Sequence, residues 1–148
     1  MREILFRGKT KTGKWAYGDL LQATEDKACL IVYMDNKRKC NYRDINPETV
    51  GQFTGLTDKN GTKIFEDDIV KVTYTEKRKS YGVKYDWEFN FIEQVIYGNE
   101  QACFMLKINN YGIIMYRPIY SFQEDIKIKE MEIIGNIHDN PELLKEQE

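Results

Sequence analysis

The sequence predicts a mainly β fold, built as a small, twisted, partly open β-barrel or as a sandwich of antiparallel strands, with a short C-terminal helix. Aromatic residues, which are enriched in strands, make up 13% of the chain. Several apolar runs of strand length are bounded by turn residues, most clearly at Asn60-Gly61. At the start of Trp87–Tyr97 apolar and polar side chains alternate with period two, which argues against a helix.

The size and composition of the chain indicate a single domain over residues 1–148. The hydrophobic content is 41%, which is enough to bury a core, and no Gly/Ser-rich linker divides the chain. The apolar runs are too short to cross a membrane, and Met1–Arg7 lacks the apolar segment of a signal peptide. We therefore expect a cytoplasmic protein without a membrane partner.

The three cysteines agree with this compartment. Cys29, Cys40 and Cys103 are odd in number and widely spaced, unlike a disulfide framework or a zinc site. We expect each of them to be a small apolar side chain in or near a strand. The chain also lacks glycine-rich phosphate loops, so we expect no metal and no cofactor.

The first fifty residues contain four expected strands. Glu3–Arg7 and Trp15–Leu21 are joined by the turn formers of Gly8–Gly13, which predicts a hairpin. Ala28–Met34 is a continuous apolar run and predicts a central strand. Arg38–Arg43 is expected to return antiparallel to that strand.

Pro47 then interrupts the strand pattern, because it has no N–H group and favours an extended backbone at Asn46. Val50–Thr54 starts the next hairpin. Its turn lies at Asn60-Gly61, where both residues tolerate a positive φ. Ile69–Tyr74 alternates as a strand leaving this hairpin.

The second half of the chain predicts further strands. Thr75–Tyr85 is polar, basic and contains glycine, so it is an exposed loop or the tip of a protruding hairpin. Trp87–Tyr97, Ala102–Ile108 and Gly112–Tyr116 are apolar-rich strands separated by turn residues. Ser121–Met131 fits neither the helical nor the strand period, so a short helix and an irregular strand both stay open.

The chain is expected to end with a strand and a helix. Ile133–Ile137 has the composition of a strand. Asn140 suits the N-cap position and Pro141 the first helical position, so they predict a short helix over Pro141–Leu144.

Four blocks of sequence resemble the YopX family of phage and prophage proteins of Gram-positive bacteria. They are MREILFRGK at the start, YGDLL from Tyr17, VGQFTGLTDKNGTKIFEDDIVKV from Val50 and IIGNIHDNPELL from Ile133. The resemblance implies a compact, largely β fold and a phage accessory role, and it carries over no catalytic residue. The family pattern more often has Gly where this chain has Asp67. Asp tolerates a left-handed backbone, so we expect the turn to persist, but a close backbone contact that needs Gly is not carried over.

An enzyme would have to use His138, the only histidine. A nucleophilic triad would combine it with Ser80, Ser121 or a cysteine. His138 lies just before the expected terminal helix, where a capping or surface residue is typical. We therefore expect a structural role for His138 and no enzymatic activity.

The acidic residues suggest turns more than a metal site. Glu66 and Asp68 would share a face of an extended segment and could contact Mg²⁺ or Ca²⁺. We expect instead that Glu66, Asp67 and Asp68 form a polar turn before the Ile69 strand. Asp58-x-Asn60 resembles the start of a calcium loop, but its glycine comes at the fourth position and not at the sixth.

One segment, Tyr74–Trp87, combines basic and aromatic residues. Small β-barrels bind single-stranded nucleic acid with a cationic groove and stacking aromatics, so nucleic-acid binding is an alternative function. The formal net charge of −2 weakens this alternative, because phosphate contacts dominate such affinity. The candidate nucleic-acid contacts are Lys77, Arg78, Lys79, Tyr81, Lys84 and Trp87.

The favoured function is non-enzymatic protein–protein association. Strand edges and surplus Tyr and Phe side chains are natural association surfaces. We expect a homo-oligomer that acts on a phage or host protein.

Overall fold

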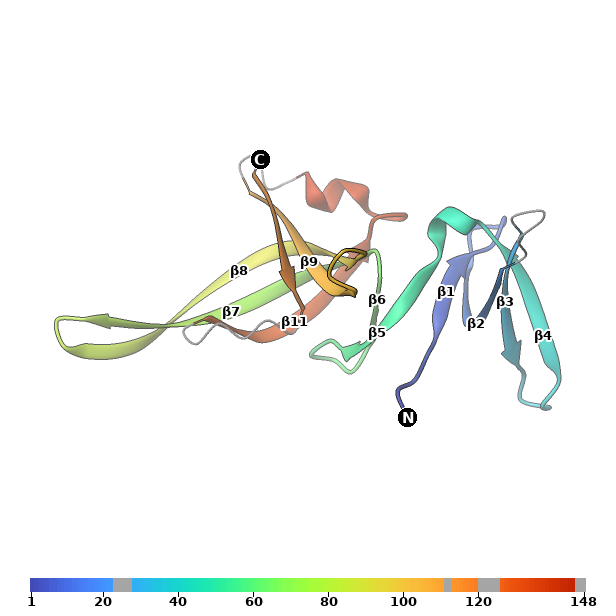
Figure 1. Cartoon of the computed structure of the whole chain (residues 1–148), viewed down its shortest axis with the longest axis horizontal. Helices are drawn as coiled ribbons and strands as arrows, with labels where there is room; N and C mark the ends of the chain where they lie inside the picture. The colour runs from blue at the N-terminus through green and yellow to red at the C-terminus, as the bar shows by residue number, and fades with distance from the viewer. Residues whose placement is uncertain (23–27, 111–112, 120–125, 146–148) are drawn as a thin grey trace. The chain divides into compact units, whose positions relative to one another are not determined.

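The computed structural model describes residues 1–22, 28–110, 113–119 and 126–145, and most of them lie in antiparallel strands (Figure 1). The prediction of a mainly β, antiparallel fold is confirmed, and neither of the two sheets closes into a barrel. The chain divides into two compact units, Met1–Leu56 and Thr57–Glu148. That residues 1–148 fold as a single domain stays a prediction. None of the described helices is long and apolar enough to cross a membrane.

The first unit is an antiparallel sheet with the strand order β4-β3-β2-β1-β5. The predicted hairpin is confirmed, with Phe6 opposite Gly18, and the predicted central strand pairs on both sides. Its small core contains Cys29, Ile31 and Ile45. The strands are β1 (Phe6–Lys9), β2 (Trp15–Gln22), β3 (Cys29–Met34), β4 (Cys40–Ile45) and β5 (Gly51–Thr57).

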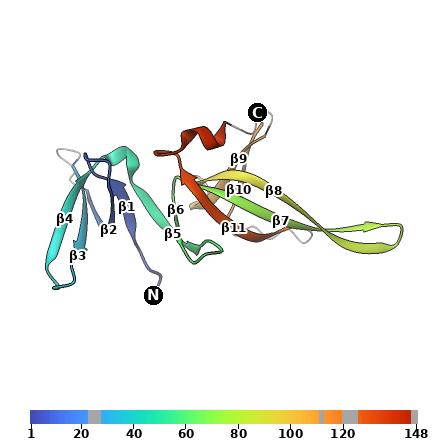
Figure 2. The ribbon, with the colours of Figure 1, turned by 180° about the vertical axis from the view of Figure 1, so that it is seen from behind.

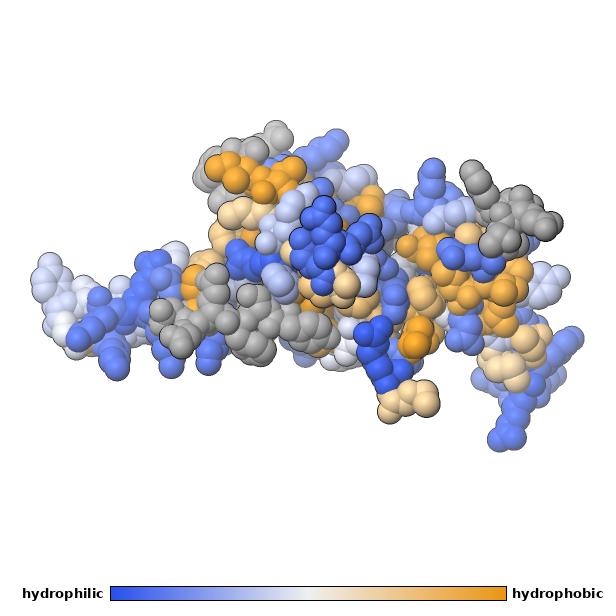
Figure 3. Space-filling view, in the orientation of Figure 1, coloured by the Kyte–Doolittle hydropathy of each residue, from blue (hydrophilic) through white to orange (hydrophobic). Residues whose placement is uncertain are grey.

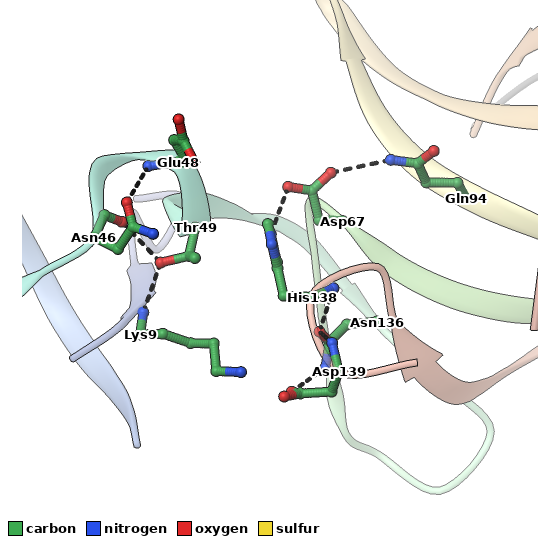
Figure 4. Close-up of polar contacts among 9 residues, drawn as sticks. All are labelled: Lys9, Asn46, Glu48, Thr49, Asp67, Gln94, Asn136, His138 and Asp139. Atoms are coloured by element: carbon green, nitrogen blue, oxygen red, sulfur yellow. Dashed lines mark hydrogen bonds and ion pairs between the residues drawn. The ribbon is translucent and has the colours of Figure 1, made fainter. Parts of the chain in front are cut away.

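A 3₁₀ turn, η1 (Pro47–Thr49), connects β4 to β5. Asn46 has the extended backbone expected before proline, and its Oδ1 accepts a hydrogen bond from the N–H of Glu48 at 3.1 Å (Figure 4). The Thr49 hydroxyl donates to the Asn46 carbonyl and accepts from the N–H of Lys9, both at 2.8 Å. The turn is therefore fixed to β1.

The second unit contains an antiparallel sheet with the strand order β10-β9-β8-β7-β11. On one face, Val70, Val72, Val95 and Leu106 are fully buried and form part of the core. The elements are β6 (Lys63–Phe65), β7 (Asp68–Ser80), β8 (Val83–Gly98), β9 (Cys103–Asn110), β10 (Ile113–Pro118), β11 (Ile126–Asn136) and η2 (Pro141–Leu144).

Strands β7 and β8 form a long hairpin that extends beyond the other strands of their sheet (Figure 1, Figure 2). Strand β11 pairs with β7 only as far as Glu76, and β9 pairs with β8 only from Gln94 onward. Residues 77–86 are thus a two-stranded ribbon, which we call the distal arm. Of the two interpretations of Thr75–Tyr85, the structure shows the protruding hairpin.

The ambiguous segment Ser121–Met131 and the strand after it are largely one strand, β11. Its register shifts between Ile128 and Glu130 and again between Ile133 and Gly135. Each bulge inverts the alternation of side chains, so neither period fits the sequence. Residues 121–125 and Gly112, which the predictions included, lie outside the described part of the chain.

The predicted short C-terminal helix is only a 3₁₀ turn, η2. The N–H of Leu143 donates to the Asn140 carbonyl at 3.2 Å, an i→i+3 bond. The side chain of Asn140 makes no capping hydrogen bond. Four residues are too few to nucleate an α-helix, so the cap sequence alone does not produce one.

Candidate functional site

The distal arm places the predicted nucleic-acid contacts on two opposite faces. Residues that pair across the strands share a face, and neighbours along a strand alternate. Lys77 pairs with Asp86 and Lys79 with Lys84, so these four side chains share one face, which we call the lysine face. Arg78 pairs with Tyr85 and Glu76 with Trp87 on the other face, which we call the aromatic face.

The lysine face is exposed and cationic. Lys77, Lys79 and Lys84 are all exposed, and the described residues give none of them an ion-pair partner. They line an open concavity on the arm together with Asp86, Arg78 and Tyr85. The outer part of the arm is hydrophilic (Figure 3).

The aromatic face is a continuous stack. The guanidinium carbon of Arg78 lies 3.6 Å from the ring centroid of Trp87. Trp87 stacks on Phe89 with 4.7 Å between centroids, and Phe89 stacks on Tyr74 at 5.4 Å. Arg78 also forms an ion pair with Glu76 at 2.7 Å. Arg78 and Phe89 thus both contact the Trp87 ring, which is still 41% exposed.

Tyr81 forms the tip of the arm. Ser80 pairs with Val83, so the loop has two residues, Tyr81 and Gly82, with φ values of 48° and 83°. Two positive φ values characterise the type I′ turn of tight hairpins. Tyr81 is fully exposed, and an aromatic residue in this backbone region is strained.

A buried polar pair lies where this stack enters the sheet. The hydroxyl of Tyr74 donates to Oε1 of Glu93 at 2.6 Å, and the guanidinium carbon of Arg117 lies 4.6 Å from the Tyr74 ring centroid. Burial raises the pKa of Glu93 to about 7, against the hydrogen bond from Tyr74 and the charge of Arg117, which lower it. Burial and the charge of Glu93 raise the pKa of Tyr74.

The burial of Glu93 could have been predicted from the alternation of side chains in its strand. Trp87, Phe89 and Phe91 alternate with polar residues at the start of β8, and the same period places Glu93 on their face. A carboxylate in register with an apolar face is the observation that identifies a buried acid.

His138 contacts Asp67, with 3.1 Å between Nε2 and Oδ2 (Figure 4). The other Asp67 oxygen accepts a hydrogen bond from the side-chain amide of Gln94 at 3.1 Å. Oδ1 of Asn136 accepts from the backbone N–H of His138 at 3.0 Å. The cluster therefore connects the start of β7, strand β8 and the segment after β11, which gives His138 a structural contact.

Asp67 has a φ of 66°, so the expected left-handed turn is confirmed without glycine. The backbone of Asp67 also helps to hold this cluster together. Its N–H donates a hydrogen bond to the Val95 carbonyl, and its carbonyl accepts one from the N–H of Ile137. The Asp67 side chain, which a glycine would lack, contacts His138 and Gln94.

The acidic residues Asp58 and Asp68, near the Asn60-Gly61 turn, stabilise turns through their side chains. Asp68 accepts from the N–H of Phe65 at 2.8 Å, and Asp58 accepts from the N–H groups of Asn60 and Thr62 at 2.9 Å each. Although burial alone would raise the pKa of Asp58, these backbone donors and Ile133 lower it. In the described part of the chain, no three His, Cys, Asp or Glu residues cluster as metal ligands would.

Strand β10 exposes a run of apolar side chains at an edge of the second-unit sheet. The four consecutive residues Ile113, Ile114, Met115 and Tyr116 are 64%, 51%, 41% and 53% exposed. A single exposed apolar residue is ordinary, but a contiguous run on an edge strand is unusual and makes β10 a candidate surface.

A protein-family model described as YopX protein matches residues 5–145, nearly the whole chain. The chain belongs to the YopX family. The crystal structure of protein EF1440 from Enterococcus faecalis is similar at 20% identity, over 97% of this chain and 99% of that one, with a TM-score of 0.48. No curated protein matches this YopX protein. Its candidate surfaces therefore come from its own geometry: the distal arm and the edge strand β10.

Proposed function

We propose that this YopX protein is a phage or prophage accessory protein of the cytoplasm, which works without catalysis by associating with other proteins. Its first partner is a second copy of the chain, in a homo-oligomer, and a phage or host protein is the target. The single observation that carries this proposal is the exposed apolar edge strand β10.

Both the backbone and the side chains of β10 suit association. An edge strand presents unpaired N–H and C=O groups that another strand can pair with. Natural edges are usually protected by charged side chains, but β10 has no charge before Arg117. Ile114 and Tyr116 project from the opposite face to Ile113 and Met115, so a partner strand gains apolar contacts on both faces.

The distance between Ser80 and His138 supports the non-enzymatic part of the proposal, whereas a His–Asp contact occurs in structural and catalytic sites alike. The ring nitrogen of His138 is engaged by Asp67, which lies just before β7. Ser80 ends the same strand, 13 residues long, so it lies about 40 Å away along an extended chain. Ser80 therefore cannot act as the nucleophile of a triad with His138.

Native mass spectrometry of the wild-type protein and two variants tests the association. Ile114→Lys with Tyr116→Lys places two charges on one face of β10, and we expect the dissociation constant of the oligomer to rise about 100-fold or more. Tyr42→Lys is the matched control, because Tyr42 is a 65% exposed tyrosine on β4, the edge strand of the first-unit sheet.

The control should keep the wild-type oligomer. A monomeric wild-type protein, or equal loss of oligomer in the control, would overturn the role of β10.

A further inference from the structure

The distal arm has a local charge opposite to that of the whole chain. Residues 77–86 contain four basic residues and one acidic residue, whereas the chain has a formal net charge of −2. Arg78 is already paired with Glu76, so the exposed charge comes from the three lysines of the lysine face. Lys79 and Lys84 lie directly opposite each other, an arrangement that destabilises a hairpin unless an anion lies against them.

The aromatic face keeps this ribbon in shape. An isolated two-stranded hairpin is marginally stable in water. Here Arg78, Trp87 and Phe89 stack in sequence up to the buried Tyr74, which fixes the arm to the core of the second unit. The lysines therefore project from a preorganised support, which lowers the entropy cost of binding.

We propose that the lysine face of the distal arm binds double-stranded DNA, with the ribbon in the major groove and Lys77, Lys79 and Lys84 against the phosphates. Strands about 4.8 Å apart form a ribbon that fits a groove about 12 Å wide. Binding through three lysines to phosphates positions the arm without reading a sequence. This inference goes beyond the proposed association and uses a different surface.

Three features of the arm favour duplex DNA over other polyanions. A protein partner would need apolar area at the centre of its contact, and the lysine face has only Lys77, Lys79, Lys84 and Asp86. A single strand stacks its bases on aromatic rings, and the lysine face carries none. Duplex RNA has a major groove too deep and narrow for side chains to enter.

Tyr81 gives the tip of the arm a contact role. Its φ of 48° costs conformational energy that Gly or Asn would avoid, yet the side chain makes no packing contact that would explain it, being fully exposed. At the tip of a ribbon in the groove, the phenol would reach the sugar-phosphate wall and donate a hydrogen bond.

Fluorescence anisotropy with a labelled duplex of random sequence, about 20 base pairs long, tests the proposal. Three phosphate contacts predict that log K falls with log salt with a slope of about −2.7, which is an affinity loss of about 40-fold between about 50 and 200 mM salt. Lys77→Gln, Lys79→Gln and Lys84→Gln together should remove the binding at the lower salt. Asp86→Asn should raise the affinity several-fold, since it removes the one carboxylate of the lysine face.

The matched control is Lys11→Gln with Lys37→Gln and Lys39→Gln, three exposed lysines of the first unit. It has the same net charge as the arm variant and should bind like the wild type. Unchanged oligomeric state and thermal unfolding of the arm variant would separate this surface from β10.

Several results would overturn the proposal. They are the absence of wild-type binding at low salt, equal losses in the arm and control variants, tighter binding of a single strand than of the duplex, and binding of polyglutamate in place of DNA.

Discussion

Tyr74 donates a hydrogen bond to Glu93 across the β7–β8 pair, and the two side chains are only 1% and 0% exposed. The second carboxyl oxygen of Glu93, Oε2, is buried without a hydrogen-bond partner among the described residues. An ionised carboxylate in this position lacks both water and a full set of donors, which is unfavourable by several kcal/mol. The second unit is therefore most stable when Glu93 carries a proton.

This pair predicts that stability falls as pH rises. Burial raises the pKa of Glu93 from 4.5 to about 7, so the folded state keeps the proton to a higher pH than the unfolded state. The free energy of unfolding should decrease by roughly 3 kcal/mol between pH 4.5 and 7 because of this group. Asp58 acts in the opposite direction only below its ordinary pKa of 3.8, outside that window.

Glu93→Gln should remove this slope, because the amide does not ionise. We expect it to be about as stable as the wild type near pH 4.5 and roughly 3 kcal/mol more stable near pH 8. Urea unfolding at four pH values measures this. Glu88→Gln, an exposed carboxylate on the same strand, should keep the wild-type slope. A Glu93→Gln protein with the wild-type slope would contradict the burial of an ionisable Glu93.

Substitutions at Asp67 separate its backbone from its side chain. Asp67→Ala removes the contacts with His138 and Gln94 and keeps the positive φ, so we expect a loss of about 2 kcal/mol. Asp67→Gly loses the same contacts but adopts the left-handed backbone without strain. It should therefore be about 1 kcal/mol more stable than Asp67→Ala. Chemical unfolding at one pH compares the two. Equal stabilities of the two variants would show that the φ of 66° is not strained.

The turn at Asn60-Gly61 allows a test of backbone conformation alone. Gly61 has a φ of 82°, and a Cβ there would meet no atom within 4 Å. Gly61→Val should therefore destabilise by about 1 kcal/mol or more through its backbone alone, and Gly61→Asn by much less. Thermal unfolding of both variants checks this, and equal melting temperatures would refute it. Asn60 also tolerates a positive φ, but among the described residues only Gly61 of this pair has one.

Local sequence patterns predicted the strands of this fold well, but not the contacts between them. The Asn60-Gly61 turn and the antiparallel order of the first strands follow from turn chemistry and apolar runs. Thr75–Tyr85 is polar enough for a loop, yet it is ordered by Arg78 on Trp87, a cross-strand contact that no single-residue propensity contains. Strand β11 was not clearly predicted because two bulges interrupt the period-two alternation of its side chains.

For the candidate sites, too, the sequence predicts local features but not the contacts between distant residues. The six predicted nucleic-acid contacts form one cluster in the sequence, but strand alternation separates Arg78 and Trp87 from the three lysines. That separation follows from period two once the segment is known to be a strand. The contact between Asp67 and His138 spans 71 residues, and one sequence offers no pattern that pairs them.

The close approach of η2 to β11 yields the final prediction. A Cβ on Gly135 would lie 2.7 Å from Oδ1 of Asn140 and 2.9 Å from Cδ1 of Leu143, so η2 packs directly on this glycine. Gly135→Ala should displace η2 and cost about 1 kcal/mol or more in the full chain. In a chain that ends at Asp139 the same substitution meets neither atom, and its cost should vanish. Urea unfolding of the four proteins forms a double-mutant cycle with a coupling of about 1 kcal/mol. A coupling of zero would mean that η2 does not pack on Gly135 in solution.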